Sequence, residues 1–392
     1  MDVVARLRQA GVTRGDLVGL AVAPGVALGL AAGTGAWAMR PGPDLAGEVA
    51  GDLAAKVARI DRELRPRWVV WSGETAVTLT ARQVRLATCW DIGAVHRLLF
   101  GGWRADPGLA WARLHQPGLA PMPASGPPDL FTHGDGGDPD EPVGPSGHVR
   151  PEWIDGGWRA SPDRVARWAQ LARSVAVRQH DALVQLKDRP MALPTARSES
   201  AAELLCAELS ADGLPMSQQA AEQVLAGFIG PRPRNEAEAA RNRAARDAAV
   251  LRHAPAGASA DLRSPAQVKT LLAAIGVDVP DTRAWRLKAL RDTHPLVAAL
   301  LQWRTAERIA TTYGYGWLDQ HLGADGRLRG AWTGSDGAAG RMTASGGLHN
   351  MPAAMRRAVV AGDGPAAGPR WPAVPTWARW PATWPRGPAA AA

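Results

Sequence analysis

A stretch rich in Pro, Gly and Asp interrupts the apolar patterning of the chain between residues 107 and 151. Its centre reads GDGGDPDEPVGPSG, a composition typical of a solvated connecting segment. The Asp-x-Asp-x-Asp-Gly spacing and the closing Glu of a calcium loop are missing, so a calcium loop is the weaker interpretation. We therefore expect a solvated linker over residues 106–160, with folded parts on both sides.

The part before this linker has the pattern of an α/β domain. Short apolar runs alternate with amphipathic segments over residues 1–105. Strands are expected at Val18–Val26 and Trp68–Trp71, and helices at Leu45–Leu64 and Ala81–Leu99.

Capping signals predict a mainly helical region after the linker. A Ser or His directly before Pro fits an N-cap followed by a first-turn proline, and Ser200-x-x-Glu203 has the spacing of a capping box. A turn at Ala324–Gly326 leads into a strand-like alternation over Arg327–Trp332. The expected helices begin near Ser161, Ser200, Ser217, Ser264 and His294.

The densest combination of turn residues, hydroxyls and arginines lies at residues 332–360, WTGSDGAAGRMTASGGLHNMPAAMRRAVV. Glycines such as Gly334, Gly337 and Gly340 allow a backbone to approach a ligand closely. Arg and Asn side chains suit phosphates and minor-groove acceptors, and a polar surface loop is the alternative. The candidate DNA-binding residues are Arg341, Thr343, Ser345, His349, Asn350, Arg356 and Arg357.

This segment resembles the palm of the family A DNA polymerases, the bacterial DNA polymerase I group. The family's Thr-Gly-Arg-Leu-Ser-Ser, Asp-Pro-Asn-Leu-Gln-Asn-Ile-Pro and Arg-Arg-Ala-Phe runs correspond here to residues 340–343, 347–352 and 356–359. This chain departs from the family by having His349 where Gln is usual and by being one residue shorter before the second run. Both departures resemble actinobacterial bifunctional 3′-5′ exonuclease/DNA polymerases, and the resemblance extends weakly back to about Ser198.

The resemblance implies an α/β N-terminal domain, a degenerate ribonuclease H-like exonuclease, followed by a mainly α thumb and the beginning of an α+β palm. The expected divisions are the exonuclease-like domain at 1–105, the linker at 106–160, connecting helices and palm entry at 161–233, thumb-like helices at 234–320, the start of the palm at 321–361, and an out-of-frame disordered tail at 362–392.

Little of the family's exonuclease metal site can be placed in this chain. Asp91, in Cys-Trp-Asp-Ile, resembles the second motif and is the single remnant we assign. Asp61-Arg62-Glu63 has the spacing of the first motif but ends a helical pattern, where a solvated charged turn is the better interpretation. The chain's tyrosines, Tyr313 and Tyr315, lie far from the expected third motif.

The palm carboxylates that hold two metal ions in the family are missing from their expected place after Val360. If G or C fills the third codon positions, reading Ala373 to Trp380 in a shifted frame gives Arg-Ala-Asp-Leu-Gly-Gln-Val. That run resembles the family's first metal-binding strand. We therefore expect a truncated or frameshifted chain with no catalytic residue and no cofactor, whereas Mg²⁺ is expected for full-length members.

The composition fits a nucleic-acid partner. A net charge of +8 favours a polyanion, although GC-rich codons also enrich arginine. Cys89 and Cys206 fall in apolar helical patterns, which indicates reduced thiols and a cytoplasmic protein. No apolar run is long enough to span a membrane.

The resemblance implies the DNA-directed DNA polymerase activity (nucleotidyltransferase) of replication and repair for the full-length family. For this chain we expect a nucleoid-associated bacterial monomer that binds primer-template duplex. The alternatives are a non-catalytic DNA-binding protein and a non-functional frameshift product.

Overall fold

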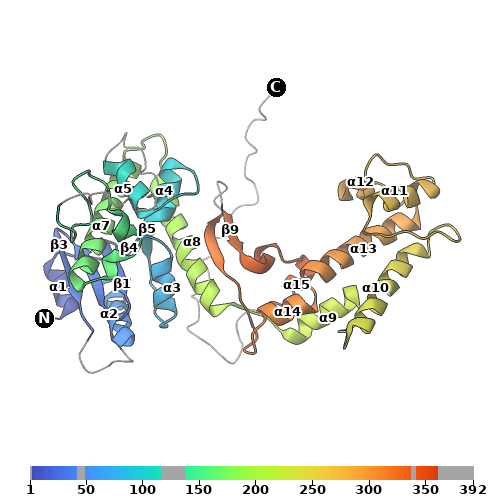
Figure 1. Ribbon diagram of the computed structural model, residues 1–392, viewed down its shortest axis with the longest axis horizontal. Helices are drawn as coiled ribbons and strands as arrows, with labels where there is room; N and C mark the ends of the chain where they lie inside the picture. Colours follow the sequence, from blue (N-terminus) through green and yellow to red (C-terminus); the bar gives the residue numbers. More distant parts are fainter. Residues whose placement is uncertain (1, 42–48, 116–136, 337–340, 361–392) are drawn as a thin grey trace, which may run out of the picture.

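The structure is a computed structural model that describes residues 2–41, 49–115, 137–336 and 341–360 (Figure 1). An α/β unit lies at the N-terminal side, a small central part with a β-hairpin follows, and a helical arm projects from that central part. The tail expected to be out of frame, residues 362–392, lies outside the described residues.

The N-terminal unit is built on a five-stranded mixed sheet with the order β3-β2-β1-β4-β5. The strands β1 (Leu17–Ala23), β2 (Ala27–Ala32) and β3 (Gly35–Met39) form an antiparallel meander. The strands β4 (Arg67–Val70) and β5 (Cys89–Asp91) continue the sheet in parallel with β1. A mixed α/β architecture is thus confirmed for this unit.

Two sequence expectations change in the sheet. The apolar run at Val18–Val26 divides at a turn, because Gly25 adopts a φ of +79° and the chain reverses into β2. The helix expected over Ala81–Leu99 is wrong in its first part, since Cys89 lies on β5 and only α4 (Ile92–Phe100) is helical. A fully buried strand of three residues has no alternation from which it could be recognised.

Helices cover both faces of the sheet. Residues of α1 (Val3–Gln9) and α2 (Val49–Leu64) share one hydrophobic cluster with β1 and β2. The long helix α7 (Pro162–Val184) covers the other face, and Ser161 caps it by accepting a hydrogen bond from the Arg164 amide at 3.2 Å.

Two strand glycines allow α7 to lie close to the sheet. A Cβ at Gly19 would come within 2.2 Å of the Ala169 carbonyl oxygen. A Cβ at Gly29 would come within 2.3 Å of the Val165 carbonyl oxygen. The helix expected to connect domains is therefore packed as part of the N-terminal unit.

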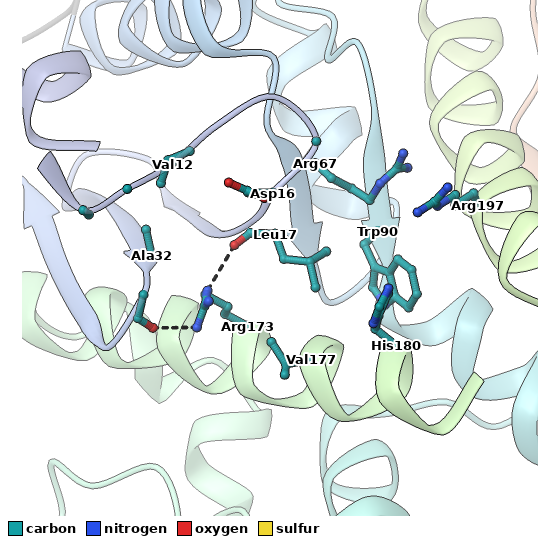
Figure 2. A pocket seen from close by; sticks show the side chains of 14 residues that line it. Val12, Asp16, Leu17, Ala32, Arg67, Trp90, Arg173, Val177, His180 and Arg197 are labelled. Atoms are coloured by element: carbon teal, nitrogen blue, oxygen red, sulfur yellow. Dashed lines mark hydrogen bonds between the residues drawn. The ribbon is translucent and has the colours of Figure 1, made fainter. Parts of the chain in front are cut away.

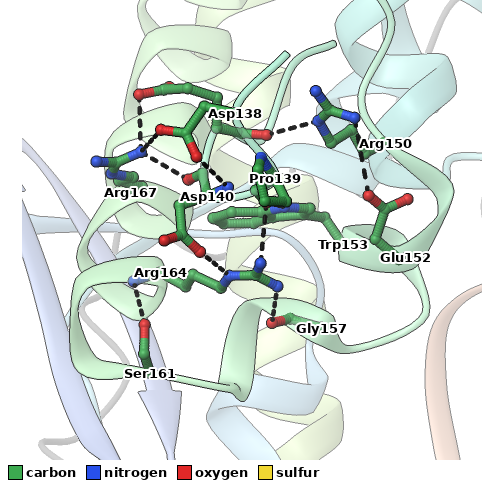
Figure 3. A network of polar contacts seen from close by, with 11 residues as sticks. Asp138, Pro139, Asp140, Arg150, Glu152, Trp153, Gly157, Ser161, Arg164 and Arg167 are labelled. Carbon is green, nitrogen blue, oxygen red and sulfur yellow. Dashed lines mark hydrogen bonds and ion pairs between the residues drawn. The ribbon is translucent and has the colours of Figure 1, made fainter. Parts of the chain in front are cut away.

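The prediction of a solvated linker does not hold for the parts of residues 106–160 that the structure describes. Residues Pro107–His115 form helix α5, and α6 (Pro151–Ile154) places Trp153 in the core with no exposed surface. Two arginines of α7 bind the acidic loop before α6: Arg164 Nε donates to Asp140 at 2.6 Å, and Arg167 Nη1 donates to Glu141 at 2.7 Å (Figure 3). The loop is ordered by partners that lie outside its own sequence.

Helix α8 (Ala192–Asp212) leads from the N-terminal unit toward the hairpin. The capping box expected at Ser200 is wrong, because the helix begins eight residues earlier, at Ala192. Ser200 is instead buried in mid-helix, where its hydroxyl donates to the Ala196 carbonyl at 2.8 Å and accepts from the Asp91 amide at 3.0 Å. Cys206 lies on this helix as expected.

The central part has a hydrophobic core of its own, which includes Met216, Leu225, Tyr313, Leu348 and Met355. A helix was expected to begin near Ser217, and Ser217 caps it by accepting from the Ala220 amide at 3.2 Å. The elements of this part are α9 (Gln218–Ile229), α14 (Tyr315–His321), β6 (Leu214–Pro215), β7 (Arg327–Leu328), β8 (Trp332–Asp336), β9 (Arg341–Ala344), a 3-10 turn (Ser345–Asn350) and α15 (Ala353–Arg356).

The helical arm also has its own core, and its predicted caps are confirmed. Ser264 accepts from the Gln267 amide at 3.5 Å, and His294 Nδ1 accepts from the Leu296 amide at 3.1 Å. Val268, Leu272 and Leu300 are completely buried in its core. The arm consists of α10 (Glu236–Leu251), α11 (Pro265–Ala274), α12 (Ala284–Ala289) and α13 (Pro295–Thr312).

Candidate nucleic-acid interface

The hairpin of β8 and β9 begins the segment in which DNA-binding residues are expected. Thr333 pairs with Thr343, and Asp336 pairs with Arg341, across an irregular antiparallel register. Successive side chains of a strand point to opposite faces, so Arg341 and Thr343 share one face. The Arg341 side chain is exposed, whereas that of Thr343 is half-buried. Gly337 and Gly340 lie outside the described residues.

Gly334 has a different role from the one expected. A Cβ there would lie 2.7 Å from the Glu203 carboxyl carbon, and the Gly334 amide donates to Glu203 Oε2 at 3.2 Å. The close approach that this glycine allows is therefore to helix α8 and not to a ligand. Glu203 also accepts from Arg97 Nη2 at 2.7 Å, so this carboxylate joins the hairpin to the N-terminal unit.

The two glycines after β9 form the expected tight turn. Gly346 and Gly347 have φ values of +64° and +71°, in the left-handed region that glycine adopts without strain. A Cβ at Gly346 would come within 2.4 Å of the His321 ring. Trp317 Nε1 donates to the Gly346 carbonyl at 2.7 Å, and Tyr313 Oη donates to that of Gly347 at 3.0 Å. Tyr313, directly after α13, and Trp317 of α14 therefore fix the position of the turn.

Three of the candidate residues stabilise this segment from within. Ser345 Oγ accepts from the Ala331 amide at 2.8 Å, and His349 Nδ1 accepts from the Ala344 amide at 2.9 Å. Arg356 Nε donates to the Met351 carbonyl at 2.8 Å. These three side chains therefore hold the backbone of the segment in place.

The remaining candidates present polar groups to solvent. Arg341 and Arg357 are exposed, and neither guanidinium has an ion-pair or hydrogen-bond partner among the side chains that the structure describes, which do not include that of Asp336, the residue paired with Arg341 across the hairpin. Asn350 is exposed too, with its amide 2.8 Å from His349 Nε2. By contrast, Arg329 is paired with Asp325 at 2.6 Å within the same part of the molecule. Both exposed guanidiniums can therefore be reached by an external anion.

Asp91, the expected exonuclease remnant, is a buried helix cap. Its Oδ1 accepts from the Ala94 amide at 2.8 Å at the start of α4, and only 2% of the residue is exposed. Burial raises its pKa to about 7, and the nearby charge of Glu203 acts in the same direction. The carboxyl is enclosed by protein and serves as the cap, and the nearby Glu203 is paired with Arg97 at 2.7 Å. Within the described residues, no three His, Cys, Asp or Glu side chains cluster as a metal site.

The interpretation of Asp61 as part of a solvated turn is wrong. The residue is 8% exposed and accepts hydrogen bonds from Trp68 Nε1 at 2.8 Å and from the Ala87 amide at 3.1 Å. Burial raises the pKa of this carboxyl, and the Trp68 hydrogen bond opposes the shift. Asp61 thus ties the end of α2 to β4, a link that the helical pattern alone could not reveal.

The fold of the α/β unit, the hairpin and the helical arm is similar to that of a DNA polymerase domain. A solved structure with a similar fold is the POL domain of Pol1 from M. smegmatis in complex with DNA primer-template and dNTP, with a TM-score of 0.52 and 19% sequence identity. The match covers 93% of this chain and 58% of that chain, so this chain spans a little over half of its length.

No protein-family model matches the sequence, and no curated protein matches it. Among the helices that the structure describes, none is long and apolar enough to cross a membrane.

Proposed function

We propose that this chain is related to the family A DNA polymerases and binds primer-template DNA without extending the primer. The observation that supports this most directly is the pair of exposed guanidiniums of Arg341 and Arg357 on a fold similar to that of a polymerase domain. The similar solved structure was determined with a primer-template, and its fold corresponds to nearly the whole of this chain. Arg is the expected side chain for such phosphate contacts.

The binding would depend mainly on charge. The chain carries a net charge of +8, and each phosphate neutralised by an arginine releases counterions into solution. In this proposal Ser345, His349 and Arg356 hold the turn, while Arg341, Asn350 and Arg357 face the duplex. Thr343 would lie beside Arg341 on the same face of β9. Affinity should then depend on salt and on duplex structure more than on base sequence.

Catalysis is not proposed for this chain. Template-directed DNA synthesis in that family needs two carboxylates that hold Mg²⁺, and the resemblance places both beyond Val359. We likewise propose that the N-terminal unit is a ribonuclease H-like exonuclease relative that has lost its activity. The mixed sheet order supports the fold assignment, and the buried cap role of Asp91 supports the loss. A monomeric, nucleoid-associated protein remains our expectation.

Fluorescence anisotropy with a labelled primer-template tests the binding proposal. Arg341→Gln with Arg357→Gln should weaken binding by about 1–3 kcal/mol per phosphate contact and reduce the slope of log affinity against log salt by about 2. Arg62→Gln is the matched control, since Arg62 is exposed on α2 in the N-terminal unit and its loss changes the charge by the same amount per site. Equal effects of the 341/357 and control variants, per charge removed, would contradict the proposal.

A primer-extension assay tests the absence of catalysis. Full-length chain, Mg²⁺, all four nucleotides and a primer-template should give no product above the protein-free control. Template-dependent extension would show that the chain assembles a metal site.

A further inference from the structure

A cavity of about 380 Å³ lies where the parallel strands of the N-terminal sheet begin (Figure 2). Leu17 and Arg67 are the first residues of β1 and β4 and line its wall, together with Trp90 of β5. Residues of α7 and α8, the segment between α1 and β1, and the end of β2 also line it. Asp91 is the last residue of β5, so the cavity is separate from the position at which an exonuclease site was expected.

The lining is strongly basic. It contains Arg67, Arg173, Arg197 and His180, against one carboxylate, Asp16. Asp16 Oδ2 already accepts from the Thr13 amide at 2.7 Å and from the Thr13 hydroxyl at 2.8 Å. Within the described part of the chain, none of the three arginines forms an ion pair with a carboxylate.

Two of these guanidiniums, those of Arg67 and Arg197, lie close to each other. Figure 2 shows the Arg67 and Arg197 side chains converging beside His180 and Trp90. Arg67 is half-buried and donates to the Cys89 carbonyl at 3.2 Å. Its pKa is lowered, first by burial and then by the charge of Arg197. An anion placed between the two would replace this repulsion by attraction.

The third guanidinium is held in a fixed orientation. Arg173 Nε donates to the Leu17 carbonyl at 3.0 Å, and its Nη1 donates to the Gly33 carbonyl at 2.6 Å. These bonds leave Nη2 as a remaining donor. An arginine fixed by backbone carbonyls at a cavity wall loses little side-chain entropy when it binds a ligand.

We propose that this cavity binds a terminal phosphomonoester. Such a group carries a charge of about −1.5 to −2 at pH 7 and can accept hydrogen bonds from more than one guanidinium fork. A single carboxylate would leave one of the facing arginines uncompensated. The volume lies in the range of small-molecule sites, and the apolar Val12 and Val177 leave a wall for an uncharged portion of nucleoside size.

The same phosphomonoester occurs on a nucleoside monophosphate and at the 5′ end of a DNA strand, and calorimetry on the full chain can separate the two sources. The probes are dAMP, inorganic phosphate, and a short single-stranded oligonucleotide with and without a 5′-phosphate. Tighter binding of dAMP than of the 5′-phosphorylated strand would identify the free nucleotide as the ligand of the cavity. Tighter binding of the phosphorylated strand than of dAMP or the 5′-hydroxyl strand would identify the 5′ end of a DNA strand as the ligand.

The variant Arg197→Gln should weaken the preferred probe about 10- to 100-fold, as expected for the loss of a charge-assisted contact. Arg197 is exposed, so this variant is expected to fold, and Arg67→Gln tests the facing side chain. Arg178→Gln is the control, because Arg178 is exposed on α7, does not line the cavity, and approaches only the Leu114 carbonyl at 3.5 Å.

Thermal unfolding in phosphate-free buffer gives a second readout. Arg197→Gln should raise the melting temperature relative to Arg178→Gln by removing the repulsion, and dAMP should stabilise the wild-type chain more than Arg197→Gln. The proposal is overturned if the wild type binds none of the phosphate probes, or if Arg178→Gln weakens binding as much as Arg197→Gln. It is independent of the proposed primer-template binding, which these probes and variants do not test.

Discussion

The chain uses arginine in two different ways at residues 137–167 and at residues 341–357. In the first region, Arg164 and Arg167 bind the carboxylates and carbonyls of an acidic loop (Figure 3). In the second, Arg341 and Arg357 are exposed, and their guanidiniums have no partner among the described side chains. Both regions read as polar, turn-rich sequence. The comparison shows that an arginine indicates an external ligand only when the chain itself supplies no hydrogen-bond or ion-pair partner to its guanidinium.

The largest expected effect tests whether the first region is structural. Trp153 is completely buried and donates to the Pro139 carbonyl at 3.1 Å, with Arg164 stacked 5.3 Å from its ring centre. Trp153→Ala should lower the free energy of unfolding by about 3–5 kcal/mol, because it creates a large cavity. Denaturant unfolding measures this loss. A loss comparable to that of a surface substitution would restore the linker interpretation.

Next in size is a pH effect that tests whether Asp91 is a cap and not a metal ligand. Its folded-state pKa of about 7 lies above the ordinary value of 3.8, so the folded state retains a proton that the unfolded state releases. The stability from this group is therefore complete below about pH 3.8 and is lost as pH rises toward 7, by about 1.4 kcal/mol per pH unit.

Asp91→Asn isolates that pH effect. Asn is also a good N-cap, so the helix start is retained while the titrating group is removed. Between pH 5 and 7 the stability of the wild type should fall relative to the variant, as measured by denaturant unfolding at each pH. Parallel pH profiles would show that the carboxyl titrates normally.

A smaller effect is expected at Arg164. Its guanidinium donates to Asp140 at 2.6 Å, to the Pro139 carbonyl at 3.0 Å and to the Gly157 carbonyl at 3.2 Å. Arg164→Gln should lower the free energy of unfolding by about 1.5–3 kcal/mol, because charge-assisted hydrogen bonds are lost from a mostly buried side chain. Thermal or denaturant unfolding provides the measurement. A loss of stability smaller than that of an exposed arginine substitution would show that these hydrogen bonds do not stabilise the fold.

Sequence reasoning worked where local chemistry determines local structure. The proline-started helices after Ser161, Ser264 and His294 and the Gly346–Gly347 turn follow from capping and backbone sterics, which a few neighbouring residues specify. The short buried strand Cys89–Asp91 could not be predicted, since its pairing depends on residues distant in the sequence.

The candidate site shows the same limit. The sequence identifies the polar side chains at residues 341–357. It does not show which of them bond within the segment and which are exposed to solvent. Ser345, for example, is engaged by the Ala331 amide, 14 residues away. The link from Glu203 to Gly334 joins positions 131 residues apart and gives no signal in the sequence. Such contacts are set by the tertiary fold and not by motif spacing.

The smallest expected effect is on the stability of the second region. Arg341→Gln and Arg357→Gln should each change the free energy of unfolding by less than about 0.5 kcal/mol, because each guanidinium is exposed and has no partner among the side chains that the structure describes. Denaturant unfolding of these two variants and of Arg164→Gln under the same conditions compares their free energies of unfolding directly. A cost at Arg341 or Arg357 as large as that at Arg164 would mean that the chain satisfies these guanidiniums itself. The distinction between the two regions would then fail, and with it the reason for assigning Arg341 and Arg357 to DNA.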